Sequence, residues 1–289
     1  MSMPRHEAPK EELVWRVLVR LPRWTVMLLG VTVGLLLVLA ALAAGSVLIA
    51  VAQAAGVQTY NAPVCGTAWT TIRTTTTYFH VYNDDFGDSG YTCIRAEQHH
   101  TDFQISTAAG SGFHAYPNIS SGWESGRYTC TGHSGACYRY PVQVKADGDP
   151  VTSMAAWLAP GRYDLSWDIW TNKTDAHPAQ DDGTEVMIWL AHPGIREGVD
   201  RVVRVDGVTW DVTTWMCHRN GASWRLLIYY AAHPRSSASG LHLNDFFHEA
   251  EGHGEMSSSY WVTGVDAGFE LVSGGVDDNI HSYSLTGVR

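Results

Sequence analysis

The sequence is poor in positive charge. Its 289 residues include 19 Lys and Arg against 29 Asp and Glu, which gives a net charge of −10. Beyond residue 54 the imbalance grows to 14 basic against 26 acidic residues, a net charge of −12. Nucleic acids are bound by basic surfaces. The composition therefore argues against nucleic acid as a partner.

Charged residues are absent from one long stretch, Thr25 to Ala55, in which Leu, Val and Ala dominate. Arginines precede this stretch, and no Lys or Arg follows it until Arg73. The positive-inside rule then places residues 1–24 in the cytoplasm as a basic N-terminal segment. Everything after residue 55 is expected outside the cell, either secreted or tethered to the membrane.

Two interpretations of residues 25–55 remain open. The stretch is longer than the apolar core of a signal peptide and longer than a bilayer span requires, which favours a retained signal-anchor helix. Ala52-Gln53-Ala54 has the small-x-small pattern of a cleavage site where the apolar run ends, which favours a signal peptide. The sequence predicts one of these two outcomes without deciding between them.

Cysteine is scarce, and all five cysteines follow the apolar stretch. Disulfides are the expected state of cysteines in an oxidising compartment. Cys130 and Cys137 enclose a short loop and are natural partners, and a bond between Cys65 and Cys93 would join the first strands. Cys217 is then left over, and we interpret it as a buried free thiol within a strand rather than a reactive or intermolecular one.

Internal repeats and low-complexity linkers are also lacking, so residues 56–289 are expected to form one domain. Runs rich in Thr, Val, Ile, Tyr and Trp, separated by Gly, Asp, Asn and Pro, predict strands. These runs cover residues 69–83, 162–172, 184–192, 200–205, 208–216, 224–232 and 259–272. One helix is expected within residues 240–254, where Leu243, Phe246, Phe247 and Ala250 recur at helical spacing and Gly252 ends the run. The predicted fold class is an all-β, two-sheet antiparallel sandwich with one packed helix.

Glu185 lies in the strand-like run TEVMIWL. Alternate residues of a strand share a face, so Glu185 is grouped with Met187 and Trp189, and the residues between them face the core. A carboxylate beside flat apolar side chains is typical of sugar-binding sites, in which the acid reacts and the aromatic rings contact sugar C–H faces. A solvated outer glutamate is the simpler alternative.

Glu270 lies in DAGFELV, on the face that also carries Gly264, Asp266 and Gly268. Glycines within a strand often mark the close approach of another group, so an open floor beside Glu270 is one interpretation. A bulge or crowded sheet packing is the other. Two carboxylates on aromatic strands suggest glycosidic bond cleavage, in which one acid protonates the leaving oxygen and the other attacks the sugar or activates water.

Asp168 is the third acidic residue of interest. It shares a face with Asp164, Ser166 and Trp170 in the run SWDIW and its flanks. If Asp168 lay beside Glu185 on a neighbouring strand, the two carboxyl groups would titrate as a coupled pair. A hydrogen bond from Asp168 to a nearby hydroxyl or amide is the alternative.

Several motifs in this order resemble those of glycoside hydrolase family 12, the concave β-jelly-roll endoglucanases and xyloglucanases. They are SWDIW, TEVMIWL, GFEL, NDDFG followed by YTCI, the single helix before the last strands, and the pairs Cys65 with Cys93 and Cys130 with Cys137. The similarity covers roughly residues 60–289, and the shared order of the motifs makes chance a poor explanation.

The resemblance implies a retaining mechanism with Glu185 as the nucleophile, Glu270 as the acid/base and Asp168 as the residue that holds and tunes Glu185. It implies a β-1,4-linked glucan as the substrate: amorphous or soluble cellulose, mixed-linkage glucan or xyloglucan. It implies no metal or organic cofactor, and we expect a monomer. The residues expected to line or support the substrate site are Asn83, Phe86, Tyr116, Met187 and Trp189.

The chain departs from the family pattern at Phe86, where the family usually has Trp, so less aromatic surface is offered to a sugar. Leu271 and Trp167 replace a common Pro and a common Tyr.

Two other functions remain possible from the sequence: a non-catalytic glycan-binding sandwich at the cell surface, and an anchored structural module whose Trp-rich strands are simply core. The first predicts binding without reducing-sugar release, and the second predicts no site that joins the two glutamates.

Overall fold

The computed structural model describes residues 61–66, 69–73, 78–87, 90–97, 101–124, 127–129, 138–144, 148–175, 182–195, 198–219 and 222–288. Contacts divide the chain into two units, Met1–Gln58 and Thr59–Arg289, and all described residues belong to the second. The apolar stretch 25–55 and the pair Cys130 and Cys137 lie outside the described residues. In the part of the chain that is described, no helix has the length and apolarity needed to cross a bilayer.

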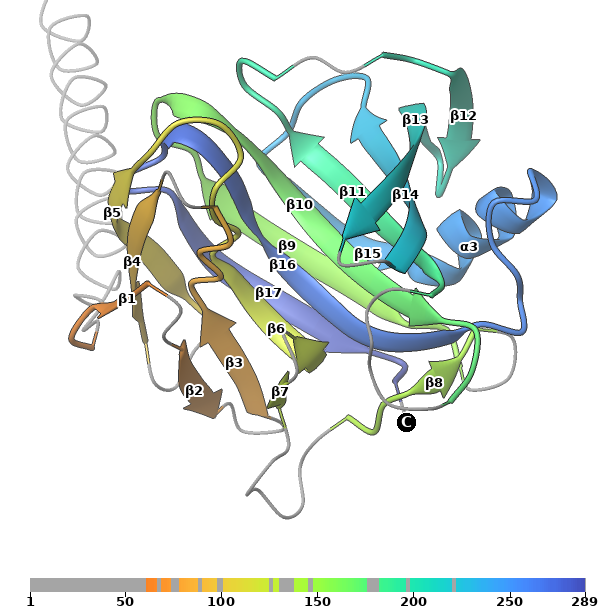
Figure 1. Cartoon of the computed structure of the whole chain (residues 1–289), viewed down its shortest axis with the longest axis horizontal. Helices are drawn as coiled ribbons and strands as arrows, with labels where there is room; N and C mark the ends of the chain where they lie inside the picture. The colour runs from red at the N-terminus through yellow and green to blue at the C-terminus, as the bar shows by residue number, and fades with distance from the viewer. Residues whose placement is uncertain are drawn as a thin grey trace, which may run out of the picture. The chain divides into compact units, whose positions relative to one another are not determined.

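The described unit is built from two sheets (Figure 1). Sheet A has the strand order β1-β4-β5-β17-β9-β15. Its strands are β1 (Val64–Cys65), β4 (Tyr91–Ala96), β5 (Phe103–Ala109), β17 (Asn279–Thr286), β9 (Val151–Trp157) and β15 (Ser237–His242). Neighbouring strands of this sheet are antiparallel.

Sheet B is the larger and has the order β12-β13-β14-β11-β10-β16-β6-β3-β2. Its strands are β12 (Arg201–Val205), β13 (Val208–Arg219), β14 (Ala222–Ala231), β11 (Thr184–Ala191), β10 (Gly161–Asn172), β16 (Trp261–Gly274), β6 (Asn118–Glu124), β3 (Tyr78–Tyr82) and β2 (Trp69–Arg73). Two short strands join its side: β7 (Arg127–Tyr128) pairs with β6, and β8 (Val142–Gln143) pairs with β16. The β11–β14 pair is parallel and the other pairs are antiparallel.

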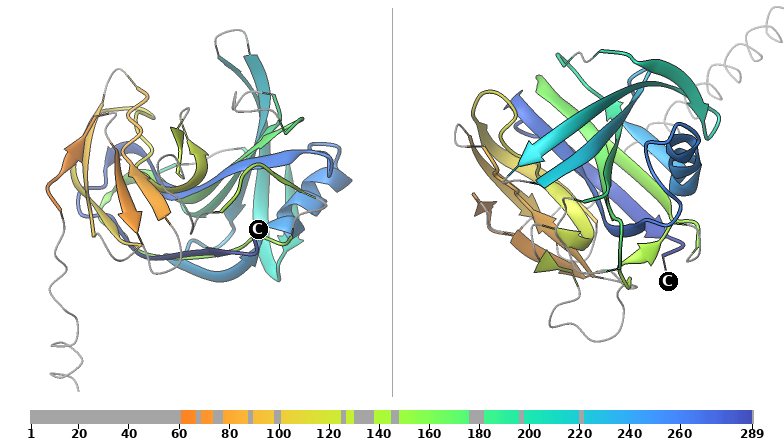
Figure 2. Two further views of the ribbon diagram at one scale, coloured as in Figure 1. Left: turned by 90° about the horizontal axis from the view of Figure 1, so that it is seen from below. Right: turned by 45° about the vertical axis from the view of Figure 1, so that its right-hand side comes forward.

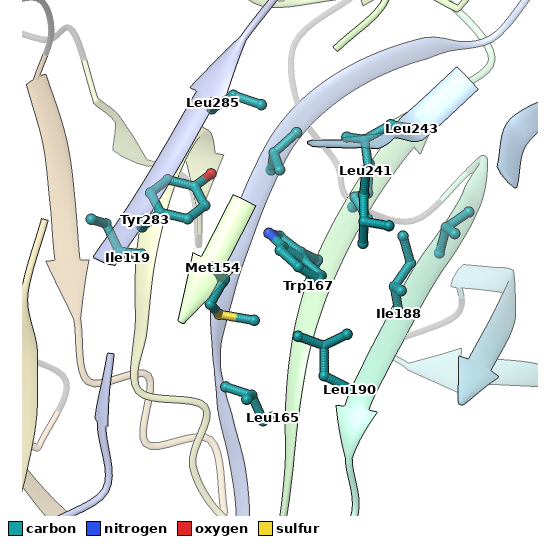
Figure 3. Close-up of a cluster of buried hydrophobic side chains, with 14 of the residues drawn as sticks. Ile119, Met154, Leu165, Trp167, Ile188, Leu190, Leu241, Leu243, Tyr283 and Leu285 are labelled. Atoms are coloured by element: carbon teal, nitrogen blue, oxygen red, sulfur yellow. The ribbon is translucent and has the colours of Figure 1, made fainter. Parts of the chain in front are cut away.

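The core lies between the sheets. β10 contributes Leu165 and Trp167, and sheet A contributes Met154 and Tyr283 from the opposite side (Figure 3). These side chains are at most 4% exposed. Strand alternation explains why every second residue of β10, β11 and β16 enters this core, because successive side chains of a strand point to opposite faces.

The expected helix is present as α3 (Leu243–Gly252), beside β12 and β14 (Figure 1). Its buried residues are Leu243, Phe246, Phe247 and Ala250, the set predicted from helical spacing. These residues belong to the same hydrophobic core as the two sheets. The prediction of a two-sheet sandwich with a packed helix is therefore confirmed.

Three local predictions can also be compared with the structure. Cys65 and Cys93 form a disulfide between the paired strands β1 and β4, as expected. The predicted run 69–83 is two strands, β2 and β3, which pair with each other. Cys217 is a free thiol in β13, as interpreted, but it is half-buried rather than buried, because its side chain lies on the face of sheet B that is turned away from the core.

Sheet B is strongly curved. Its two ends, β2–β3 and β12–β13, rise on opposite sides of β16, on the side away from β17 (Figure 2, left). The face of sheet B turned away from the core is therefore concave. We call it the open face; β10, β11 and β16 run through its centre, and β13 and β14 continue it toward one end.

Candidate active site

The three predicted acids lie on three adjacent strands of the open face. Glu185 is on β11, Asp168 is on the central β10, and Glu270 is on β16. The alternate residues of all three strands belong to the core cluster between the sheets. The faces assigned from strand parity are therefore confirmed. The three acids lie on the same side of one sheet.

Two indole N–H groups donate hydrogen bonds to Glu185 and Asp168. Trp224 of β14 donates from Nε1 to Oε2 of Glu185, and Trp170 donates from Nε1 to Oδ2 of Asp168 at 3.0 Å. The rings of Trp170 and Trp224 lie 5.9 Å apart. Glu185 is 9% exposed and Asp168 is 7% exposed, so these bonds form away from bulk water, where hydrogen bonds to a charged group are strongest.

Asp168 is a diagonal neighbour of Glu185. In the antiparallel β10–β11 pair, Asp168 is opposite Met187 and Trp170 is opposite Glu185. Diagonal residues on one face of a sheet are within reach of each other's longer side chains. The placement of Asp168 beside Glu185 agrees with the sequence analysis, and its tuning role stays a prediction.

Glu270 has a different environment, because its direct cross-strand partner is Asp164 of β10. Asp164 is fully buried and accepts a hydrogen bond of 2.6 Å from the Ser166 hydroxyl. Glu270 keeps a little contact with solvent but is closely surrounded by protein. Burial, and then the negative charges of Asp164 and Glu185, raise the pKa of Glu270 well above its ordinary value.

Glu185 and Glu270 lie on the two strands that flank β10. Their register positions on this strand, Trp170 for Glu185 and Asp164 for Glu270, are separated along its length. The face that carries both residues is concave (Figure 2, left), and a concave face brings its side chains closer together than a flat one does. The charge of Glu185 contributes to the raised pKa of Glu270, so the carboxyl groups interact.

The segment between β3 and β4 is connected to the Glu270 strand through the residues around His114. The amide of Phe86 donates to the carbonyl of His114 at 3.0 Å, and the amide of His114 donates to Leu271 at 3.1 Å. Phe86 is 40% exposed, as a sugar-stacking ring must be. Asn83 is fully buried instead, and its side-chain amide donates to the carbonyl of Thr92. Asn83 therefore supports this segment and presents no free surface to a ligand.

Tyr116, Met187 and Trp189 are buried on the open face. The Tyr116 hydroxyl donates to the carbonyl of Ser166 at 3.2 Å, and burial with the charge of Asp168 raises its pKa well above the ordinary value. Met187 and Trp189 form a second hydrophobic cluster with Ile195, Ile228, Tyr230 and Val272. Trp189 is only 3% exposed, so it supports the face, and contact of this ring with a sugar stays a prediction.

The glycines of β16 have a packing explanation. A Cβ atom on Gly268 would lie 2.3 Å from the carbonyl oxygen of Pro117, and one on Gly264 would lie 2.6 Å from that of Trp123. Both neighbours belong to β6 or to the residue before it. Of the two interpretations, crowded sheet packing is the one that accounts for these glycines, because the close backbone of β6 leaves no room for side chains there.

Sequence reasoning missed the contribution of β13 and β14. Cys217 is the cross-strand partner of Trp224, and Trp215 is the partner of Leu226, so both face the open side. Trp215 is 49% exposed. Burial, and then the charges of Glu185 and Glu270, raise the pKa of the Cys217 thiol to about 11.

The sequence does contain a pattern that indicates the face on which Trp224 lies. Alternate residues of the run 224–232 begin with Trp224 and share one face. Strand parity does not predict that β14 lies next to β11, because this neighbour relation depends on the strand order of the sheet.

For metals, no group of three or more His, Cys, Asp or Glu side chains suited to hold an ion is found within the described ranges.

Comparison with known proteins is consistent with this arrangement. Residues 77–286 match the model of glycosyl hydrolase family 12. Xyloglucan-specific endo-β-1,4-glucanase A of Aspergillus niger is 25% identical over 256 residues, covering 83% of this chain and 97% of that protein. Endoglucanase A of Aspergillus kawachii is 24% identical over 160 residues, covering 53% of this chain and 66% of that protein.

Solved structures share the fold. The endoglucanase Cel12A of Rhodothermus marinus superposes with a TM-score of 0.68 at 26% identity, covering 78% of this chain and 99% of that one. A family 12 xyloglucanase from Bacillus licheniformis has a TM-score of 0.67 at 21% identity, covering 78% and 100% of the two chains. Because the family match spans well over half of its length, the chain belongs to glycosyl hydrolase family 12 and is an O-glycoside hydrolase.

Proposed function

We propose that the domain is a retaining, endo-acting hydrolase of β-1,4-glucosidic bonds in a glucan. The observation that carries this proposal is the unequal setting of two carboxyl groups on one concave face. Glu185 accepts a hydrogen bond from Trp224, which favours the ionised form. Glu270 has a raised pKa, which favours the protonated form. A nucleophile and a general acid need these two states.

In the proposed mechanism, Glu185 attacks the anomeric carbon while Glu270 donates its proton to the glycosidic oxygen. The bond to the leaving sugar breaks, and a covalent glycosyl ester forms on Glu185. Glu270, now ionised, takes a proton from water, and the resulting hydroxide displaces the ester. Asp168, held by Trp170, keeps Glu185 in place on the neighbouring strand.

The substrate class is proposed from two sources. The aromatic side chains on or beside the open face include the exposed Phe86 and Trp215, which suit the C–H faces of glucose units. The relatives named above include an endoglucanase and a xyloglucan-specific endo-β-1,4-glucanase. We therefore propose soluble or amorphous cellulose, mixed-linkage glucan or xyloglucan as the polymer.

Activity on these polymers tests the proposal. Purified residues 56–289 should release reducing sugar from carboxymethylcellulose, lichenan or xyloglucan. Glu185→Gln and Glu270→Gln should each lower kcat by at least about 100-fold, the scale of a lost acid/base group. Glu251→Gln, an exposed glutamate on α3, is the matched control. Wild-type activity in either active-site variant, or binding without hydrolysis by the native domain, would overturn the proposal.

A second measurement separates the two roles. An aryl β-cellobioside with a strongly acidic phenol needs no proton donor, so Glu270→Ala should still form the glycosyl-enzyme quickly and Glu185→Ala should not. In the native protein, NMR should show the β-anomer as the first product from a β-linked substrate. An α-anomer as the first product would indicate inversion and would refute a covalent intermediate on Glu185.

We propose further that the domain acts outside the cell as a monomer, either secreted or held at the membrane by residues 25–55. Fractionation of cells expressing the full chain should place the hydrolase outside the cytoplasmic membrane. Mass determination of the mature protein then distinguishes cleavage near residue 54 from a retained anchor. Recovery of intact full-length protein in the cytosol would contradict both alternatives.

A further inference from the structure

One pair of acids on the open face is not explained by the family resemblance. Asp164 of β10 and Glu270 of β16 are direct partners in the antiparallel register, and their carboxyl groups are hydrogen-bonded to each other. Two carboxyl groups in contact share a proton, because both cannot be ionised at low cost. The shared proton is carried by either Asp164 or Glu270.

The surroundings of Asp164 favour its ionised form within the pair. Its side chain is fully buried, and its Oδ1 atom already accepts the Ser166 hydroxyl at 2.6 Å. Its Oδ2 atom is also buried, and no N–H or hydroxyl group in the described part of the chain makes a well-formed hydrogen bond to it. The backbone amides of Asp164 and Glu270 also favour the charged carboxylate. A protonated Glu270 offers the buried Oδ2 atom a further donor.

We propose that Asp164 is a positioning residue for the acid/base step: its buried carboxylate accepts the proton of Glu270 in a hydrogen bond and so keeps Glu270 protonated for attack on the glycosidic bond. This inference rests on the proposed function, since it assigns a partner to the proposed acid. Asp164 itself neither gains nor loses the proton. Glu270 passes it to the leaving oxygen and regains one from water.

The charges around Glu270 act in the same direction. Asp164 faces it from β10, Glu185 from β11 and Asp84 from the segment before β4, and each raises the pKa of Glu270. The Cys217 thiol of β13 is neutral at ordinary pH because its own pKa is raised to about 11. The hydrogen bond between the acids lowers the pKa of Asp164 and raises that of Glu270. Burial still leaves Asp164 with a pKa of about 7.

Asp164→Asn tests the inference, because it removes the charge while keeping the size of the side chain. Without that charge Glu270 should lose its proton more easily. The basic limb of the kcat/KM profile should move to lower pH by about one unit or more, the scale of a close like charge, while the acid limb stays in place. Asp278→Asn is the control, since Asp278 is another buried aspartate with a pKa of about 7 and lies outside the open face. A folded Asp164→Asn protein with an unmoved basic limb would overturn the inference.

A titration without turnover distinguishes failure of this inference from failure of the proposed function. Carboxyl ¹³C NMR of Glu-labelled protein, with the Glu270 signal assigned through Glu270→Gln, should show a lower pKa of Glu270 in Asp164→Asn. If that shift appears and the native protein hydrolyses no glucan, the pairing stands and the function fails. If Asp164→Asn does not fold, Ser166→Ala should move the proton toward Asp164 and lower the plateau of kcat/KM. An unchanged plateau and an unchanged Glu270 signal in Ser166→Ala would contradict the pairing.

Discussion

Single side chains give the two glutamates different chemistry. Glu185 accepts a hydrogen bond from the indole N–H of Trp224, a donor that does not ionise and so cannot transfer its proton to the carboxylate. Glu270 lies against Asp164, an acid. Two carboxyl groups of the same type are thereby expected to differ in protonation at one pH, which is how a nucleophile and an acid coexist in one site.

Phe86 is expected to contribute to substrate binding through its exposed ring. Phe86→Ala should raise KM for cello-oligosaccharides about 2- to 10-fold with little change in kcat, because an aromatic contact is worth roughly 0.5–1.5 kcal/mol. Phe86→Trp should lower KM, since the indole offers a larger face. Tyr91→Ala, an exposed aromatic on sheet A, should leave KM unchanged. Equal KM values for all three variants would place Phe86 outside the binding surface.

Cys217 provides a chemical probe of the open face. Its pKa of about 11 leaves a thiolate fraction on the order of 0.1% at pH 8, so alkylation by iodoacetamide should be slow and should accelerate about tenfold per pH unit. The adduct should inhibit hydrolysis, because it would add bulk to the open face directly beside Trp224, which donates a hydrogen bond to Glu185. Bound oligosaccharide should slow the labelling. Cys217→Ser should be active and insensitive to the reagent, and loss of activity at an unlabelled Cys217 would refute this placement.

The helix α3 and the turn that follows it are hydrogen-bonded to the strands that carry Glu185 and Trp224. Arg201 of β12 makes four hydrogen bonds to Glu249 and Glu255, at and beyond the end of α3. The same turn accepts hydrogen bonds from Thr184 at 2.8 Å and from Arg225 at 2.9 Å. Thr184 precedes Glu185 in β11, and Arg225 follows Trp224 in β14, so the packing of the helix helps to fix the β11 side of the site.

Removing Arg201 should therefore destabilise the domain. The side chains of Arg201, Glu249 and Glu255 are between 13% and 18% exposed, so Arg201→Met would leave two largely buried carboxylates without a counter-charge. Loss of a buried partner costs roughly 3–5 kcal/mol, and partial exposure lowers this to about 2–3 kcal/mol. Urea unfolding should show this loss. Arg204→Met, at an exposed position of the same strand, should change stability by less than about 0.5 kcal/mol. Equal stabilities for the two variants would contradict a structural role of the network.

The whole domain keeps several acids in its interior, which couples its stability to pH. Asp278, between β16 and β17, is fully buried and has a pKa of about 7 against 3.8 for an ordinary aspartate. The folded state binds this proton more tightly than the unfolded state does. Its contribution is therefore complete below about pH 4 and is lost as the pH rises to about 7.

Asp278→Asn should remove this dependence. The shift in pKa corresponds to at most about 4 kcal/mol between pH 4 and pH 8. Thermal unfolding of the native domain should show a lower Tm at pH 8 than at pH 5, and the difference should be smaller in Asp278→Asn. Parallel Tm curves for the two proteins would show that Asp278 is not protonated in the folded state at pH 5.

Local patterns in the sequence predicted much of sheet B. Alternation placed Asp168, Glu185 and Glu270 on their faces, and helical spacing predicted α3. Sheet A was largely missed, because strands such as β9 and β17 carry Ser, Ala and Thr at many positions and lack the β-branched and aromatic density of β10 or β11. These strands form through pairing with distant segments, which no local window contains.

Local sequence patterns were enough to assign which side chains of each strand face outward, because the side-chain period of a strand is two residues. They also predicted the apolar face of α3 and the cysteine pair of β1 and β4. The folded domain was needed to show which outward-facing side chains meet: Trp224 with Glu185 and Asp164 with Glu270. Those encounters depend on strand order, register and the curvature of sheet B, which arise from contacts between segments far apart in the chain.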